Sequence, residues 1–305
     1  MTLTPDESGR SQVTSDQKSM PESHPYRSKS WRGPVSGAMA CAVMALALAS
    51  CAQDQPSLDS SVRDITVATD TAPEGSILPA HISGVLTRVT PSFVTMVISE
   101  PMKRFGADVG IPRGVSSGSG FVIDRSGLVM TAAHVAYAPK YSVRAQASNG
   151  RIYRGKVIKL MPGNDAGLVR IFSFNAPPVT PAASPCLKKG QAVFSLGRPH
   201  AGGDTARIGS VRSMHFSRAV HYGKFGYPDA MVLKMATRRG ESGGPVFNAD
   251  GELVGMVVST LSAGGRPLNL AHAIPLPPLA RFYCQSAKCG PRWRKLAAMN
   301  TRDCK

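Results

Sequence analysis

Apolar and polar positions alternate in short runs along most of this chain, and few long stretches repeat with the period of a helix. Turn residues separate the runs, for example Asp-Arg-Ser-Gly at 124–127 and Ser-Asn-Gly at 148–150. This rhythm predicts strands joined by tight turns at the spacing found in β-barrels. The predicted strands are residues 92–99, 119–124, 128–132, 142–147, 151–160, 167–172, 191–196, 206–214, 230–236, 245–247, 253–260 and 269–274.

A proline-rich segment divides these strands into two series. Residues 175–185 carry four prolines, which cannot occupy central strands because proline lacks a backbone N–H. We therefore expect an all-β protein in which two small barrels are joined by an extended linker. The predicted parts are an N-terminal barrel over 81–176, a linker over 177–190, a C-terminal barrel over 191–275 and a tail over 276–305.

The N-terminal region has the features of an export signal. Residues 33–53 carry no charge, follow Arg27, Lys29 and Arg32, and include an apolar core. This order is typical of a secretory signal. The core ends in Leu-Ala-Ser-Cys at 48–51, which resembles the bacterial lipoprotein signal. We expect residues 1–51 to be such a signal. Acylated Cys51 would then anchor the protein to a membrane in the bacterial periplasm or at the cell surface.

Two alternatives to lipidation remain open for this leader. Ordinary cleavage after Ala-Leu-Ala at 47–49 is one, and an uncleaved anchor is the other, because the uncharged stretch nearly reaches spanning length. All three place the protein outside the cytoplasm, and translation starts at Met1 or Met20. Residues 52–80 are rich in Ser, Asp, Thr and Pro, which predicts a flexible tether between the anchor and the folded body.

The cysteine content fits an exported protein. Besides Cys41 and Cys51 in the leader, four cysteines remain: Cys186, Cys284, Cys289 and Cys304. Four cysteines allow two disulfides in three connectivities. Cys284 and Cys289 are near enough in sequence to close a small loop, and Cys186 with Cys304 would then tie the tail to the body. A metal site is the rival interpretation, but no histidine lies at ligand spacing beside these cysteines.

The chain is strongly basic, with a formal net charge of +17. A basic chain suggests anionic partners, but excess charge also serves solubility alone. No run of Lys and Arg interleaved with aromatic residues occurs, and no nucleic-acid-binding motif is present. We therefore predict no specific nucleic-acid partner.

Residues 240–245, Gly-Glu-Ser-Gly-Gly-Pro, carry the strongest chemical signal. A serine hydroxyl becomes a useful nucleophile when it is exposed and a base takes its proton. Flanking glycines let the backbone turn sharply, so that the N–H groups of Gly240 and Ser242 can face a developing oxyanion. By itself the motif is also compatible with a plain glycine-rich turn.

Two further motifs supply the partners that such a serine needs. His134 stands in Thr-Ala-Ala-His-Val at 131–135, directly after an apolar strand, and Asp165 precedes another apolar strand. Taken singly, each residue has an ordinary structural explanation. Together they suggest Ser242 as nucleophile, His134 as general base and Asp165 as the group that orients the histidine. The order His, Asp, Ser is the chymotrypsin order.

The chain resembles the HtrA-family serine proteases from about residue 81 to residue 275. The motifs that carry the resemblance are residues 118–124, 131–135, 165–169, 194–199, 240–245, 251–255 and 273–275. The resemblance implies two six-stranded antiparallel Greek-key barrels of the chymotrypsin type, with the active site in the cleft between them. It also implies endopeptidase activity on protein or peptide substrates, without a metal or other cofactor.

The resemblance also implies a substrate pocket. In this fold the residue six before the nucleophile lies at the base of the pocket, and here it is Ala236, with Thr237 beside it. Val258 and Ser259 complete the predicted pocket, and residues 257–260 would pair with the substrate backbone. Because no carboxylate is present, we expect a preference for small apolar side chains.

The chain departs from the family in two places. About thirty residues follow 273–275, too few for the PDZ domain that HtrA proteins usually carry, so we expect none. Glu241 stands where the family often has Asn and where trypsin-like enzymes have the Asp that receives a freed N-terminus. An acylated Cys51 on a long tether makes such an activation step unexpected. The resemblance leaves the oligomeric state open.

The sequence therefore predicts a serine endopeptidase that acts through an acyl-enzyme on envelope or exported proteins. The main alternative is a catalytically silent or gated lipoprotein of the same fold that binds peptides or proteins. An esterase with the same triad is disfavoured, because the motif order differs and no Gly-x-Ser-x-Gly turn is present.

Overall fold

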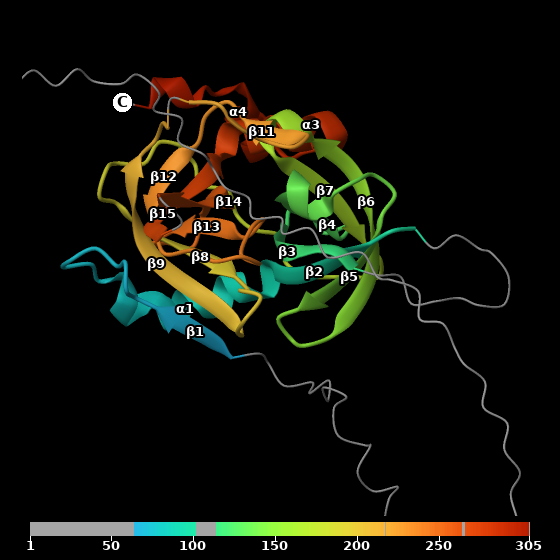
Figure 1. The fold of residues 1–305 in the computed structure, drawn as a ribbon, viewed down its shortest axis with the longest axis horizontal. Helices are drawn as coiled ribbons and strands as arrows, with labels where there is room; N and C mark the ends of the chain where they lie inside the picture. Colours follow the sequence, from blue (N-terminus) through green and yellow to red (C-terminus); the bar gives the residue numbers. More distant parts are fainter. Residues whose placement is uncertain (1–63, 102–113, 217, 264–265, 305) are drawn as a thin grey trace, which may run out of the picture. The chain divides into compact units, whose positions relative to one another are not determined.

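The computed structural model describes residues 64–101, 114–216, 218–263 and 266–304 (Figure 1). Its first barrel is a closed antiparallel sheet. In spatial order the strands are β2 (Phe93–Ser99), β3 (Gly114–Val122), β4 (Leu128–Ala132), β7 (Ala166–Ile171), β6 (Ile152–Met161) and β5 (Ser142–Ala147), and β5 pairs back with β2. The alternation in β5 explains its orientation, because Val143, Ala145 and Ala147 are buried while the polar residues between them face outward.

The second barrel closes in the same way. Its strands are β8 (Ala192–Gly197), β9 (Asp204–Ser213), β12 (Met231–Lys234), β15 (Arg266–Pro275), β14 (Leu253–Ala263) and β13 (Pro245–Asn248), and β9 pairs back with β8. Each strand predicted from the sequence overlaps one of these barrel strands. The predicted all-β, chymotrypsin-like fold of two six-stranded barrels is confirmed.

The proline-rich linker runs in extended form between the barrels and is bonded to both. The N–H of Val179 donates to Val122 O of the first barrel, and the N–H of Leu253 in the second barrel donates to Thr180 O. The hydroxyl of Ser92 donates to Pro177 O at 2.7 Å. One of these bonds uses a proline carbonyl and the other two use backbone groups of Val179 and Thr180, so the linker is held in place without being a full strand.

The segment predicted as a flexible tether is partly ordered. Strand β1 (Ile65–Ala68) pairs in parallel with β9, and helix α1 (Leu78–Val89) begins inside the predicted tether. The helix buries one face, with Ile82, Val85 and Val89 at helical spacing. The prediction is therefore wrong for residues 64–80, because a partner strand distant in sequence orders a polar segment. Residues 52–63 and the predicted signal with Cys51 lie outside the described residues.

The C-terminal tail is helical. Helices α3 (Leu276–Ser286) and α4 (Pro291–Ala298) pack on each other, with the rings of Tyr283 and Trp293 edge to face at 5.3 Å between centroids. Short 3₁₀ turns are η1 (Thr90–Ser92), η2 (Pro162–Asn164) and η3 (Thr301–Asp303). None of the helices in the described ranges is long and apolar enough to cross a membrane.

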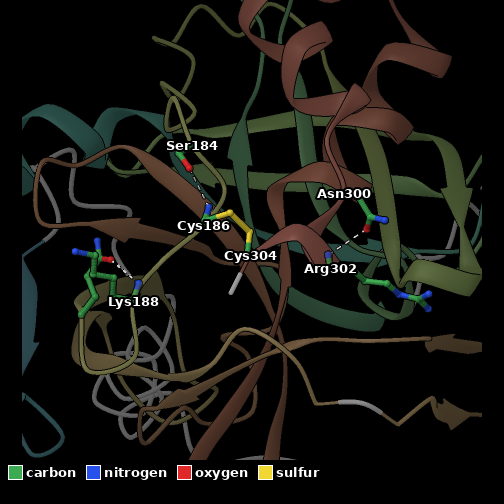
Figure 2. The surroundings of a disulfide bond; sticks show 7 residues. Ser184, Cys186, Lys188, Asn300, Arg302 and Cys304 are labelled. Atoms are coloured by element: carbon green, nitrogen blue, oxygen red, sulfur yellow. Dashed lines mark hydrogen bonds between the residues drawn. A yellow bond between two sulfur atoms is a disulfide. The ribbon is translucent and has the colours of Figure 1, made fainter.

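Two disulfides hold the tail. Cys284 pairs with Cys289 at the end of α3, and Cys186 of the linker pairs with Cys304 at the end of the chain. Figure 2 shows the second bond, where Ser184 accepts the N–H of Cys186 and Asn300 accepts the N–H of Arg302. This is the connectivity that sequence proximity favours.

We predict that the two disulfides differ in their contribution to stability. Cys186–Cys304 spans 118 residues and Cys284–Cys289 spans 5. In the chain-entropy model, the longer loop restricts the unfolded chain more, by about 2–3 kcal/mol. The double variant Cys186→Ser/Cys304→Ser should therefore unfold at lower denaturant than Cys284→Ser/Cys289→Ser. Equal unfolding midpoints for the two variants would contradict this prediction.

Candidate active site

His134 and Asp165 form a hydrogen-bonded pair at the end of the first barrel. Helix α2 (Ala133–Ala136) follows β4 and carries His134, whereas Asp165 follows η2. The Nδ1 atom of His134 lies 2.8 Å from Oδ2 of Asp165, and the backbone N–H of His134 donates to Oδ1 at 3.0 Å. The carboxylate is fully buried and the imidazole is 27% exposed. Asp165 therefore fixes the ring while leaving part of it open to solvent.

The backbone at Asp165 explains how the carboxylate reaches the histidine. Asp165 has φ of 44°, in the left-handed region where Asp is among the better tolerated side chains. Its carbonyl accepts the N–H of Ala133 at 3.0 Å, which ties the turn after η2 to the start of α2. Both residues of the pair are thus positioned by one local backbone junction.

Tyr222 is a third member of this cluster. It ends β10 (Val220–Tyr222), which forms a hairpin with β11 (Phe225–Tyr227) between β9 and β12. The phenolic hydroxyl donates to Oδ2 of Asp165, and the rings of Tyr222 and His134 meet edge to face at 5.6 Å. Burial raises the pKa of Tyr222, and the charge of Asp165 raises it further, so the hydroxyl stays protonated and remains a donor.

The loop that carries Ser242 docks against the first barrel. The N–H of Ser119 donates to Ser242 O at 2.9 Å. Gly243 has φ of 84°, and a Cβ there would lie 2.3 Å from Thr131 Oγ1 and 2.9 Å from the Ala132 backbone N. Only glycine fits this approach. The loop therefore meets the segment that leads into α2 and His134.

The hydroxyl of Ser242 is free of strong bonds. Its recorded contact among the described residues is a long bond of 3.4 Å to Val258 O. Gly240 has φ of 97°, and its carbonyl accepts the hydroxyl of Ser119. Among the described residues, the N–H groups of Gly240 and Ser242 have no hydrogen-bond acceptor. Both amides are therefore available to an incoming oxygen.

Two predicted pocket residues, Ala236 and Thr237, follow β12, and the other two, Val258 and Ser259, lie on β14. Thr237 is buried and its hydroxyl lies 2.9 Å from that of Thr260, so the two hold the segment after β12 against β14. Ala236 is half-buried and Val258 is buried. Tyr227 links Ser259 and buried His272 through its hydroxyl. Burial lowers the pKa of His272 to about 4, although the charge of Asp229 opposes the shift, and the ring is neutral at pH 7.

Comparisons with known proteins agree with this geometry. Residues 118–256 match the trypsin-like peptidase domain family. The chain is 28% identical over 184 residues to a probable periplasmic serine endoprotease DegP-like of Halomonas elongata. It is 30% identical over 223 residues to mitochondrial serine protease HTRA2 of Drosophila ananassae.

Residues 118–256 are thus similar to a trypsin-like peptidase domain, and the relatives that the chain resembles are named DegP-like and HTRA2 serine proteases. The matches cover 57% of this chain and 37% of the Halomonas protein, and 72% of this chain and 50% of the Drosophila protein. The chain thus spans half or less of the length of these relatives.

Solved structures show the same fold. The peptidase domain superposes on the crystal structure of Rv3671c protease, inactive form, with a TM-score of 0.55 at 23% identity, covering 73% of this chain and 100% of that chain. An HtrA-type protease, AlgW with tripeptide, has a TM-score of 0.54 at 21% identity, covering 67% and 62%.

A buried ion pair includes Glu241 of the 240–244 loop. Nε of Arg207 donates to both carboxylate oxygens of Glu241, at 2.7 and 2.9 Å, and both side chains are buried. The N–H of Arg238 also donates to Glu241. Burial raises the pKa of Glu241, and Arg207 opposes the shift. An internal arginine thus holds the carboxylate that, in trypsin-type activation, receives a freed N-terminus.

Sequence reasoning named neither Tyr222 nor Arg207. Tyr222 lies in a segment whose sequence predicts a loop, and no feature of the neighbouring sequence links it to Asp165. Arg207 gives a signal, because it interrupts an apolar strand, and a charge at a buried strand position predicts a buried partner. The docking of the 240–244 loop brings Ser242 against β3 and the segment that leads to His134, and Tyr222 joins His134 and Asp165 there.

We predict that Tyr222→Phe lowers kcat about tenfold with little change in KM. The variant removes a hydrogen bond to a charged group, which is worth roughly 1.5–3 kcal/mol. The orientation of Asp165 and His134 should loosen, while substrate contacts remain. Steady-state kinetics on a peptide substrate would measure this change. Tyr137→Phe, at a tyrosine near the histidine with an exposed ring, is the matched control and should leave kcat unchanged.

We also predict that Arg207→Met destabilises the domain by about 3–5 kcal/mol, because Glu241 would remain buried without its partner. The double variant Arg207→Met/Glu241→Gln removes both charges and should recover most of this loss. Denaturant unfolding of the two variants measures the difference. If the double variant were as unstable as the single one, the ion pair would not be the cause.

Proposed function

We propose that this protein is a serine endopeptidase that hydrolyses peptide bonds through an acyl-enzyme. Ser242 is the nucleophile, His134 the general base and Asp165 the group that orients the imidazole. The N–H groups of Gly240 and Ser242 form the oxyanion hole. The observation that carries the proposal is the bond between His134 Nδ1 and buried Asp165 Oδ2, beside a loop that presents Ser242 with an uncommitted hydroxyl.

The proton steps follow from this arrangement. With Nδ1–H donating to Asp165, the other ring nitrogen of His134 is the basic one and can accept the proton of Ser242 as its oxygen attacks the carbonyl. The imidazolium that forms is stabilised by the Asp165 carboxylate, whose Oδ2 also accepts the hydroxyl of Tyr222. The imidazolium then protonates the leaving amine. Water attacks the acyl-enzyme with His134 again acting as base.

A rotation of Ser242 precedes attack. Its hydroxyl points to Val258 O at 3.4 Å, a contact too weak to hold it. Catalytic hydrogen bonds are often long in a substrate-free enzyme and tighten when substrate binds. The resting geometry therefore fits a triad that is completed by substrate.

The substrates we propose are exported or envelope proteins. A DegP-like relative is named as periplasmic, and the leader of this chain has the pattern of a lipoprotein signal. Small apolar side chains would enter a pocket formed by Ala236, Thr237, Val258 and Ser259. Lipid on Cys51 would keep the enzyme at the membrane surface.

Labelling with a fluorophosphonate probe tests the proposed nucleophile. The probe phosphonylates a serine only when a base activates it, so we expect modification at Ser242, mapped by mass spectrometry. Ser242→Ala should abolish labelling and peptide hydrolysis. The control is Ser126→Ala, which removes a surface hydroxyl in the turn between β3 and β4 and should leave labelling unchanged.

An unlabelled protein with cooperative unfolding would instead favour the alternative, a protease-fold protein that binds peptides without cleaving them. In that case the same pocket residues would serve recognition alone. Binding of unmodified peptides by the wild-type chain, without product formation, would then be the expected result.

A further inference from the structure

A cavity of about 430 Å³ opens beside the nucleophile loop. Gly240 of that loop and Gly118 of β3 form its inner edge. Because Gly240 supplies a proposed oxyanion N–H, this edge lies next to the position of the scissile carbonyl. None of the four predicted pocket residues lines the cavity. A substrate chain that continues past the scissile bond would therefore enter it.

The floor of the cavity is an outward face of the first barrel. Val97 of β2 is directly opposite Arg144 of β5, and Gln146 of β5 is directly opposite Ile152 of β6. Residues opposite each other, or two apart on one strand, share a face of a sheet. Val97 and Ile152 are 41% and 40% exposed, so apolar surface is open to a bound chain.

The opposite wall carries an arginine held in a fixed orientation. Nε of Arg198 donates to Asp204 Oδ1 at 2.8 Å, and Nη1 donates to Gln146 Oε1 at 2.9 Å. Asp204 is buried and the guanidinium is 30% exposed. Two of its five N–H donors are used in these bonds. The remaining donors are positioned without further loss of side-chain freedom.

The lining has an excess of positive charge. Among the residues that the structure describes, the ionisable side chains of the lining are Arg144, Arg198 and His200, and none is a carboxylate. Arg144 has no recorded acidic partner among the described residues, and it lies opposite Arg154 across β5 and β6. Like charges directly opposite each other disfavour the sheet. An anion between Arg144 and Arg198 would relieve that repulsion and gain charge-assisted hydrogen bonds.

We propose that this cavity binds a carboxylate in the leaving half of the substrate, within about three residues after the scissile bond. The carboxylate is an Asp or Glu side chain or the C-terminus of the substrate. Arg144 and Arg198 recognise it, and Val97 with Ile152 contacts the neighbouring substrate atoms. The inference rests on the proposed peptidase activity and adds a charge preference to it.

The test uses the full chain and quenched fluorescent peptides that share one acyl half. Amidated peptides come in three sets, which place Glu, Gln or Lys at each of the first three leaving positions in turn, and a fourth peptide has neutral side chains and a free C-terminus. We expect kcat/KM to be about tenfold higher with Glu than with Gln, and lowest with Lys. The fourth peptide separates a C-terminal carboxylate from a side-chain one. The preference should weaken with added salt, because the arginines are partly exposed.

Charge reversal then identifies the residues. Arg144→Glu should reverse the order, so that Lys is cleaved faster than Glu. Arg125→Glu is the matched control, because it makes the same change at an exposed arginine outside the cavity lining. Equal kcat/KM for Glu and Gln at every position, with the amidated and free C-termini also equal, would overturn the proposal. So would an equal effect of the two charge reversals.

An activated ester of a short acyl peptide keeps this result separate from the proposed function, since its leaving group does not reach the cavity. If the ester is hydrolysed but the peptides show no charge preference, the carboxylate site is refuted and the peptidase activity stands. No turnover of ester or peptides refutes the peptidase activity, and the carboxylate site with it. Denaturant unfolding of Arg144→Glu with the wild-type midpoint shows that this variant is folded.

Discussion

The close contact between the 240–244 loop and the first barrel is the constraint on which the rest of the site depends. The loop approaches β3 and β4 so closely that no side chain fits at Gly243, and a bond from the Ser119 N–H to Ser242 O fixes the distance. Neither barrel contains the site alone. His134 and Asp165 belong to one barrel and Ser242 to the other, so the tightness of this contact decides whether the three can act together.

Two buried carboxylates, those of Asp165 and Glu241, lie near this contact, and each accepts several hydrogen bonds. Asp165 accepts the His134 ring, the His134 backbone and Tyr222, while Glu241 accepts Arg207 and the N–H of Arg238. A buried carboxylate without such donors would be costly. Here the donors come from elements that also carry the nucleophile loop, the hairpin and β9. The same bonds that satisfy the charges therefore hold these elements in place, which suits a site that must not reorganise during reaction.

Part of the net charge of +17 is clustered at one place in the structure. At the cavity beside Gly240, two arginines from different barrels face a common space, and one of them is fixed by a buried aspartate. The predicted side-chain pocket on the other flank of Ser242 is lined by small and aliphatic residues and carries no charge. If the proposed function holds, the substrate would be recognised by apolar side chains before the scissile bond and by charge after it.

The sequence alone determined the all-β class, the two strand series and the local motifs around His134, Asp165 and Ser242. Alternation and glycine-rich turns are short-range features, so they can be read from neighbouring residues. Helix α1 was not predicted, although Leu78, Ile82, Val85, Leu86 and Val89 follow a helical period. Only the tertiary structure decided that β1 pairs with β9, that Tyr222 reaches Asp165 and that Arg207 reaches Glu241. Those contacts join residues 34 to 139 positions apart, and the chain that carries them is brought together by barrel closure, which no local pattern encodes.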